Sequence, residues 1–156
     1  MYLKQAQDKP MGMFNSRYEC KVDAKGRLAL PAKIKAAIPE SNGVELILRQ
    51  GDDGCLALYT QVEFKKLLHQ INSLSDRDPV QRRIKRSFFE SMTEVELDNA
   101  GRFLIPKTFM TWAGIDKDAI LIGVGGFVEI WSPEKYRQNI VADQAELSKL
   151  MDQYLS

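Results

Sequence analysis

The chain has little of the residue chemistry on which metal centres and disulfide frameworks depend. Its 156 residues include two cysteines, Cys20 and Cys55, and one histidine, His69. These three side chains are too few and too scattered for a Cys/His zinc site. They also favour a chain kept reduced in a cytoplasm over one held together by disulfides. We therefore expect no metal site and a cytoplasmic location.

Signals for membranes and for common enzyme sites are missing as well. The longest apolar run, residues 119–124, is the length of a strand and far short of the ~18 residues of a membrane span. The first 14 residues, MYLKQAQDKPMGMF, lack the apolar stretch of a signal peptide. No nucleophile elbow, P-loop or dinucleotide-binding glycine motif occurs. We expect no enzymatic activity, no cofactor, no small-molecule substrate and no membrane partner.

The chain has almost no excess charge of either sign. It carries 22 Lys and Arg against 21 Asp and Glu, a net charge of +1. A nearly neutral protein is not attracted to nucleic acid as a whole, so that function would need a local basic patch. Positive charge does gather between residues 17 and 35, where Glu19 and Asp23 face six basic residues: Arg17, Lys21, Lys25, Arg27, Lys33 and Lys35.

The chain contains an internal repeat. Residues 22–34, VDAKGRLALPAKI, and residues 97–109, LDNAGRFLIPKTF, share Asp-x-x-Gly-Arg-apolar-x-apolar-Pro at an offset of 75. Further matches follow in the same order: 46–48 with 121–123 at that offset, 55–59 with 127–131 after a loop shortened by three, and helix starts at Thr60 and Ser132. Such an ordered series indicates a duplication.

Each copy opens with a tight turn between two strands. Asp23 and Gly26, like Asp98 and Gly101, stand at the first and fourth positions of a type I turn. In such a hairpin the glycine takes the left-handed conformation and forms a bulge. The four residues are therefore predicted to be structural, with each aspartate bonding the amides of its own turn. The flanking strands are expected at 18–22, 27–30, 94–97 and 102–105.

The repeats divide the chain into five segments. A flexible arm over residues 1–12 precedes a first repeat over 17–62, and a helical linker over 63–91 leads to a second repeat over 92–134. A single C-terminal helix is predicted over 135–156. The linker and tail helices show apolar residues at helical spacing.

The predicted fold is α+β. Four short strands and one helical turn make only half a core, so two such halves must interlock to bury their apolar residues. We expect one pseudo-twofold β-barrel per chain, with the two glycine turns related by the axis and helices from the linker and tail outside it.

The turns place basic residues where a duplex could be bound. A two-stranded ribbon fits the major groove, and arginine suits guanine edges, so Arg27 and Arg102 are candidate base contacts. A surface ion pair with the neighbouring aspartate is an equally good interpretation of either arginine alone. Four lysines are candidate phosphate contacts, although lysines more often form a solvated face: Lys25, Lys33, Lys35 and Lys107.

The residues that carry these motifs also resemble a known family. FNSRYECKVDAKGRLALPAKI, residues 14–34, is similar to the opening of the MraZ family of bacterial regulators. The second Asp-x-x-x-Arg, within LDNAGRFLIP, and the linker DPVQRRIKRSFFESM also match that family in order. The likeness covers residues 13–140.

The resemblance implies two SpoVT–AbrB-like repeats that form a swapped-hairpin barrel within one chain. It implies a ring-shaped homo-oligomer, located in the cytoplasm with the nucleoid, that binds double-stranded promoter DNA at short direct repeats upstream of division and cell-wall genes. It places Arg27 and Arg102 on the DNA-facing surface and Lys25 at a basic position that Ala100 occupies in the second motif. The alternative function is an AbrB-type antitoxin-like or scaffold module that binds a protein partner.

Overall fold

The computed structural model describes residues 13–39 and 45–156, so the expected arm over residues 1–12 lies outside the described residues. The first repeat contains β1 (Arg17–Lys21), β2 (Arg27–Ala29), α2 (Ala32–Ala36), β3 (Glu45–Gln50), the 3₁₀ turn η2 (Asp52–Gly54) and β4 (Leu56–Tyr59). The second repeat contains β5 (Met92–Glu96), β6 (Arg102–Leu104), α5 (Lys107–Ala113), β7 (Asp118–Gly123) and β8 (Val128–Trp131). The predicted mixed α+β fold with two similar halves is confirmed.

Helices fill the linker and the tail. Between the repeats stand α3 (Gln61–Asn72) and α4 (Pro79–Glu90), and after them α6 (Pro133–Gln138) and α7 (Gln144–Leu155). The predicted helix starts are confirmed, since the Thr60 hydroxyl accepts a hydrogen bond from the Glu63 amide and the Ser132 hydroxyl accepts one from the Lys135 amide. No helix in the described parts of the chain combines the length and apolar character of a membrane span.

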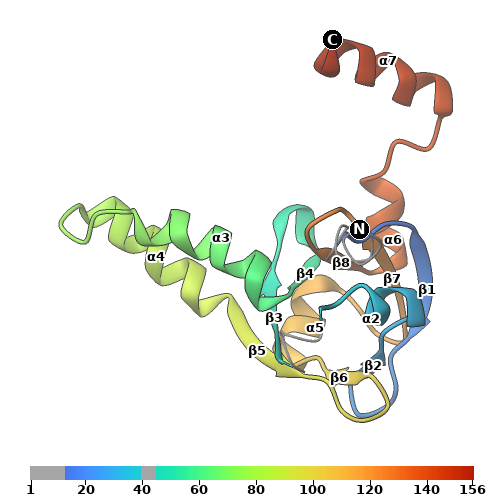
Figure 1. Cartoon of the computed structure of the whole chain (residues 1–156), viewed down its shortest axis with the longest axis horizontal. Helices are drawn as coiled ribbons and strands as arrows, with labels where there is room; N and C mark the ends of the chain where they lie inside the picture. Colours follow the sequence, from blue (N-terminus) through green and yellow to red (C-terminus); the bar gives the residue numbers. More distant parts are fainter. Residues whose placement is uncertain (1–12, 40–44) are drawn as a thin grey trace, which may run out of the picture.

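The strand order shows how the halves interlock. The large sheet runs β1-β7-β8-β4-β3-β5, and the small sheet pairs β2 with β6 (Figure 1). When each strand is exchanged for its counterpart in the other repeat, the same order results, read from the opposite edge of the sheet. This is what a two-fold relation requires. β1 of the first repeat pairs with β7 of the second, and β5 of the second pairs with β3 of the first. Neither repeat therefore completes its sheet alone.

The register locates the pseudo-twofold axis. In the small sheet Leu28 lies opposite Phe103, its own counterpart at the offset of 75. On the far side, Ala57 lies opposite Glu129, its counterpart at an offset of 72. Residues pair with their own counterparts only on a two-fold axis, so the axis passes through both points.

Strand pairing alone gives two sheets instead of one closed barrel. β1 and β5 are the edge strands of the large sheet, and each continues through a tight turn into β2 or β6. Beyond the ladders, the described residues form two isolated bridges: Val22 pairs with Leu28 within the first hairpin, and Phe14 pairs with Gly125. Among residues 13–39 and 45–156, no ladder closes the two sheets into one.

The structure corrects one part of the repeat alignment. β3 and β7 share the same burial pattern residue by residue, which aligns Leu46-Ile47-Leu48 with Ala119-Ile120-Leu121 at an offset of 73. The predicted match of 46–48 with 121–123 is therefore wrong by two residues. Residues 119–122 form one apolar run, and a run without alternation cannot fix its own register.

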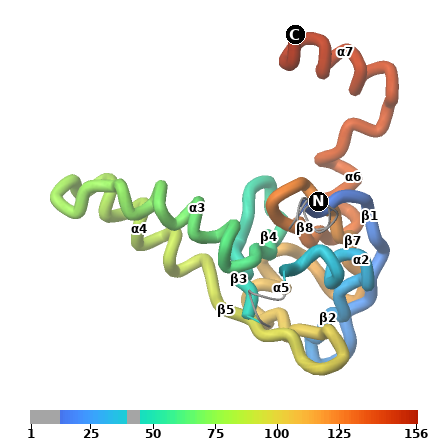
Figure 2. The backbone as a smooth tube through the Cα atoms, viewed as in Figure 1, coloured from blue at the N-terminus to red at the C-terminus, as the bar shows by residue number. Residues whose placement is uncertain are grey.

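The core lies between the sheets, and helices cover the outer face of the large sheet. Leu28, Leu48, Leu121, Phe103 and Ile130 are at most 1% exposed. Outside, Phe64 of α3 packs with Ile47 and Tyr59, and Tyr136 of α6 packs with the equivalent Ile120 and Trp131. These two helices are thus equivalent in the repeats, although α3 continues into a long arm with α4 (Figure 2).

The predicted single C-terminal helix over 135–156 is divided in the structure. α6 ends at Gln138 and α7 begins at Gln144. Asp143 caps the start of α7, since its side chain accepts a hydrogen bond from the Ala145 amide. Aspartate favours such a cap because its oxygen satisfies an amide that has no partner in the first turn. The apolar spacing across residues 136–151 is typical of one continuous helix, but the cap at Asp143 inside that range starts a second helix.

Candidate nucleic-acid interface

The first loop is built by Asp23. Its Oδ1 accepts hydrogen bonds from the amides of Lys25 and Arg27, each at 2.9 Å, and the Gly26 amide donates to its carbonyl at 3.0 Å. Gly26 has a φ of +90°, and a Cβ there would lie 3.2 Å from the Ile105 carbonyl oxygen. The predicted left-handed glycine is confirmed.

The second loop repeats this geometry. Asp98 Oδ1 accepts from the amides of Ala100 and Arg102, each at 2.9 Å, and the Gly101 amide donates to the Asp98 carbonyl at 2.9 Å. Gly101 has a φ of +76°. Each aspartate thus bonds the amides of its own turn, which is the contact expected of a structural residue.

These hydrogen bonds lower the pKa of both carboxyl groups. The amide of Arg27 is the largest cause of a pKa for Asp23 below its ordinary value of 3.8, and the amide of Arg102 has the same effect on the pKa of Asp98. Both carboxylates are open to solvent, so the pKa shifts reflect hydrogen bonding to the charged form.

We expect this lowering to make stability depend on acid pH. A carboxyl whose folded pKa is depressed stabilises the fold fully above its unfolded pKa of about 3.8, and that contribution is lost as the pH falls further. Carbon-13 NMR titration should place both pKa values below 3.8. The variant Asp23→Asn/Asp98→Asn should show a weaker fall in the free energy of unfolding between pH 5 and pH 3. Titration at or above 3.8 would contradict the assignment.

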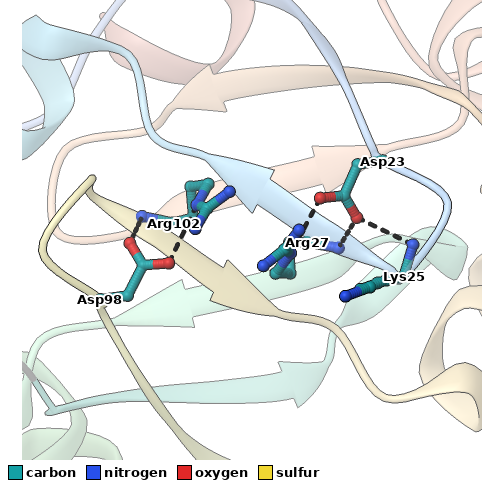
Figure 3. A network of polar contacts seen from close by, with 5 residues as sticks. All are labelled: Asp23, Lys25, Arg27, Asp98 and Arg102. Atoms are coloured by element: carbon teal, nitrogen blue, oxygen red, sulfur yellow. Dashed lines mark hydrogen bonds and ion pairs between the residues drawn. The ribbon is translucent and has the colours of Figure 1, made fainter.

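The arginines are held by the same aspartates and stay open to solvent. Arg27 Nε donates to Asp23 Oδ2 at 2.8 Å, and Arg102 Nε donates to Asp98 Oδ2 at 2.9 Å (Figure 3). Their side chains are 34% and 37% exposed. Within the described residues, no hydrogen bond engages the terminal Nη atoms of either guanidinium. The predicted ion pair forms, and it holds each arginine at Nε while the described residues leave its terminal nitrogens unengaged.

Both arginines lie on the outer face of the small sheet. Arg27 is opposite Leu104, and Arg102 is opposite Ala29. Residues directly opposite one another point to the same side, and alternate residues along a strand do too. These four side chains therefore form one face, with the arginines on its diagonal, while Leu28 and Phe103 point into the core.

The candidate lysines are distributed across the repeats. Lys107 of the second repeat lines the same cavity as Lys25 of the first loop. Lys35 of the first repeat lies against the second loop, since a Cβ on Gly101 would be 3.2 Å from its Cδ. Lys33 lies apart from both loops, beside Phe14 and Tyr18. Each loop therefore has beside it a lysine from the short helix of the other repeat, Lys107 of α5 at the first loop and Lys35 of α2 at the second.

The surroundings of the two loops differ in charge. An open cavity of about 820 Å³ beside the first loop is lined by four lysines and two aspartates, namely Lys21, Lys25, Lys107, Lys117, Asp23 and Asp116. At the second loop, Ala100 stands in place of Lys25, and Ala32 in place of Lys107. Lys35, which lies against the second loop, corresponds to the uncharged Met110 beside the first loop. The ribbon is therefore symmetric in backbone and asymmetric in charge.

Sequence reasoning missed Lys117, which lies in the connection from α5 to β7 of the second repeat and lines the cavity beside the first loop. It named Lys21 only as part of the basic cluster over residues 17–35; Lys21 ends β1, and its Nζ pairs with Asp118 at 2.6 Å. Their approach depends on the pairing of β1 with β7, which no local pattern in the sequence encodes. Among the described residues, no group of three or more His, Cys, Asp or Glu could hold a metal ion.

Comparison with known proteins agrees with the repeat. The sequence model of the family described as "MraZ protein, putative antitoxin-like" matches residues 13–87 and again residues 88–153. A transcriptional regulator MraZ from Cytophaga hutchinsonii is 42% identical over 146 residues, covering 94% of this chain and 97% of the relative.

Two other relatives carry the same name. The transcriptional regulator MraZ of Thermomicrobium roseum is 42% identical over 135 residues, covering 86% of this chain and 89% of its own length. That of Mycoplasmoides gallisepticum is 36% identical over 126 residues, covering 81% and 86%. The resemblance stated from the motifs is confirmed, and with it the expectation that the protein is not an enzyme. The chain belongs to the MraZ family of transcriptional regulators and contains the family's domain twice.

Proposed function

We propose that the protein is a sequence-specific DNA-binding regulator that binds short direct repeats in the promoter of division and cell-wall genes. It acts as a ring-shaped homo-oligomer in the cytoplasm, associated with the nucleoid. The observation that carries the proposal is the outer face of the β2–β6 ribbon, where Arg27 and Arg102 lie together with their Nε atoms held by aspartates.

The shape and chemistry of this face suit the major groove. A two-stranded ribbon fits that groove, and a guanidinium presents two parallel donors to the O6 and N7 atoms of guanine. An aspartate on Nε leaves the terminal nitrogens for that contact, and it removes rotamer freedom before binding. The arginines then specify bases, while nearby lysines bind phosphates and position the ribbon.

The charge asymmetry of the ribbon supports binding to direct repeats. A ribbon with two equal ends would bind a site in either direction. Here the first loop has Lys25 and Lys107 beside it, whereas Ala100 and Ala32 occupy the equivalent positions at the second. One end is therefore favoured for phosphate contact, so each subunit binds in a fixed direction, as rotationally related subunits on direct repeats require.

We also propose that the two sheets act as one swapped-hairpin barrel. In support, the two turns join the edge strands of the large sheet to the small sheet, and within the small sheet the Ile105 amide donates to the Gly26 carbonyl at 2.9 Å and the Leu30 amide donates to the Gly101 carbonyl at 3.0 Å. Each turn is thereby tied to the strand end of the other repeat. A rigid connection between the loops keeps both arginines in register with the groove.

Fluorescence anisotropy with promoter DNA tests the function. A duplex carrying several short direct repeats should bind at least ~10³-fold more tightly than a scrambled duplex of equal length. The logarithm of the binding constant should fall linearly with the logarithm of salt concentration, because bound phosphates release counterions. Equal affinity for both duplexes, or no binding at low salt, would reject the proposal.

The lysines of the first loop should contribute through phosphates alone. We expect Lys25→Ala/Lys107→Ala to weaken binding to specific and scrambled DNA alike, and to reduce the salt slope by about one for each lost contact. The matched control is Lys33→Ala, which removes a lysine lying apart from both loops. A slope unchanged by the double substitution would remove these lysines from the interface.

A further inference from the structure

The open cavity beside the first loop has the size and the fixed walls of a small-molecule site. Its volume of about 820 Å³ lies within the range of roughly 300–1,000 Å³ that is typical of ligand pockets. Two hydrogen bonds between the repeats hold its walls, since the Val22 amide donates to the Lys117 carbonyl at 2.8 Å and the Ile105 amide donates to the Gly26 carbonyl at 2.9 Å. The cavity is therefore a fixed part of the fold.

The cavity carries an excess of positive charge. Two of its charged side chains are already paired, Lys21 with Asp118 and Asp23 with Arg27. Within residues 13–39 and 45–156, no ion pair engages the other lysines of its lining: Lys25, Lys107 and Lys117. Three lysines against Asp116 leave an excess of two positive charges. This excess suits phosphate groups, which accept charge-assisted hydrogen bonds from lysine.

The fold itself does not require these lysines. The second loop has the same backbone geometry, with a left-handed glycine and an aspartate that bonds the amides of the turn. There, alanine replaces both Lys25 and Lys107, and Glu96 replaces Lys21. Because both loops fold alike, the lysines of the first loop are available for binding and are not needed for structure.

Apolar side chains form the rest of the lining. They come from both repeats: Val22, Leu104, Ile105, Pro106, Met110 and Ile115. The Met110 thioether lies against the first loop, since a Cβ on Gly26 would be 3.6 Å from its Sδ. A methionine sulfur makes favourable contacts with aromatic rings. Apolar residues next to unpaired lysines suit a ligand that joins an aromatic ring to phosphates.

We propose that this cavity binds a free nucleotide, with its base against Met110 and its phosphates on Lys25, Lys107 and Lys117. A nucleotide combines the two chemistries of the lining, an aromatic base and a group of negative charges. It fits a cavity of this volume, and the lysines reach it from the first loop, from α5 and from the connection between α5 and β7.

The bound nucleotide lowers the affinity for DNA. Leu104 lines the cavity and also lies opposite Arg27 on the outer face of the ribbon, and Lys25 lies beside the Asp23–Arg27 pair (Figure 3). The nucleotide occupies Lys25 and Lys107, which are the proposed contacts for DNA phosphates, and it adds negative charge next to the ribbon. In this respect the proposal rests on the proposed function.

Calorimetry in the absence of DNA tests the site, with ADP and GDP as probes. We expect both to bind about tenfold or more tightly than inorganic pyrophosphate, because the base contacts the apolar wall. Lys117→Glu and Thr111→Glu change exposed residues of the lining and should each weaken nucleotide binding by about tenfold or more. The matched control is Lys33→Glu, which makes the same charge change at a lysine apart from both loops and should change the affinity less than about threefold.

Three results would each overturn the proposal: no binding of either nucleotide, pyrophosphate binding as tight as that of ADP and GDP, or nucleotide binding that neither cavity variant weakens. Circular dichroism should show the parent spectrum for every variant. Thr111→Glu leaves all the lysines in place, so it tests the cavity even if Lys117→Glu disturbs the fold.

Anisotropy with repeat-bearing DNA at constant ionic strength tests the effect on binding. Saturating ADP should lower the parent's affinity for DNA to that of Lys25→Ala/Lys107→Ala or below. It should change the affinity of that variant less than about threefold, because the lysines that both ligands use are gone. A parent affinity that ADP leaves unchanged would overturn the proposal. Nucleotide binding by a protein that binds no DNA would reject the proposed function and leave the nucleotide site standing, and DNA binding without nucleotide binding would do the reverse.

Discussion

Arg27→Ala/Arg102→Ala should lower the affinity for repeat-bearing promoter DNA by roughly 10²- to 10⁴-fold while the protein stays folded. Each arginine that contacts guanine with two hydrogen bonds contributes about 1–3 kcal/mol of discrimination, and ~1.4 kcal/mol is tenfold in affinity. The fold should persist because the broken ion pairs are at the surface, where such pairs contribute ~0–1 kcal/mol. Anisotropy titration against specific and scrambled duplexes measures the loss.

Two comparison variants make this result specific to the arginine fork. Arg27→Lys/Arg102→Lys keeps the charge but not the planar pair of donors, so it should retain binding to scrambled DNA and lose preference for the repeats. Arg77→Ala removes an exposed arginine from the turn between α3 and α4 and should change affinity less than threefold. Parent affinity in the double alanine variant would exclude both arginines from the interface.

Phe103→Ala should lower the free energy of unfolding by about 3–5 kcal/mol. Phe103 is 1% exposed and lies opposite Leu28 on the pseudo-twofold axis, so its ring fills the core of both repeats. Natural domains unfold with about 5–15 kcal/mol, so this loss removes a large part of the stability. Urea unfolding followed by circular dichroism and by tryptophan fluorescence measures it.

The neighbouring residue gives a matched control. Leu104 follows Phe103 in β6 but points outward and is 54% exposed, so Leu104→Ala should change the free energy of unfolding by less than about 1 kcal/mol. Because the repeats exchange strands, both probes should report one transition in every variant. Separate transitions would show that the repeats do not share a core, and equal effects of the two substitutions would contradict the central place of Phe103 in that core.

The parts of the structure that follow from short-range chemistry could be predicted. Asp23 and Asp98 bond amides two and four residues away, and Gly26 and Gly101 supply the backbone conformation that the turn requires. Such features depend on a few neighbouring residues, so a sequence pattern is enough to identify them. The interlocking of the halves was predictable for a related reason, since neither half alone can bury its apolar residues.

Features that depend on pairing between repeats could not be predicted in detail. The pattern around Lys35 and Lys107 places each lysine after its own turn, yet each lies beside the turn of the other repeat. The two-residue shift of β7 against β3 was hidden by an apolar run that fits either register. The division of the tail into α6 and α7 has a local cause instead, the cap at Asp143, which the continuous apolar spacing across the tail concealed.

The proposed interface places the outer face of the β2–β6 ribbon against DNA. Site-specific cross-linking tests this placement most directly. A photoreactive benzophenone side chain at position 29 or 104 would stand between the two arginines on the outer face of the ribbon. Both positions should cross-link to repeat-bearing DNA on illumination, and position 62, exposed on α3, should not. Cross-links from position 62 with none from 29 or 104 would contradict the interface.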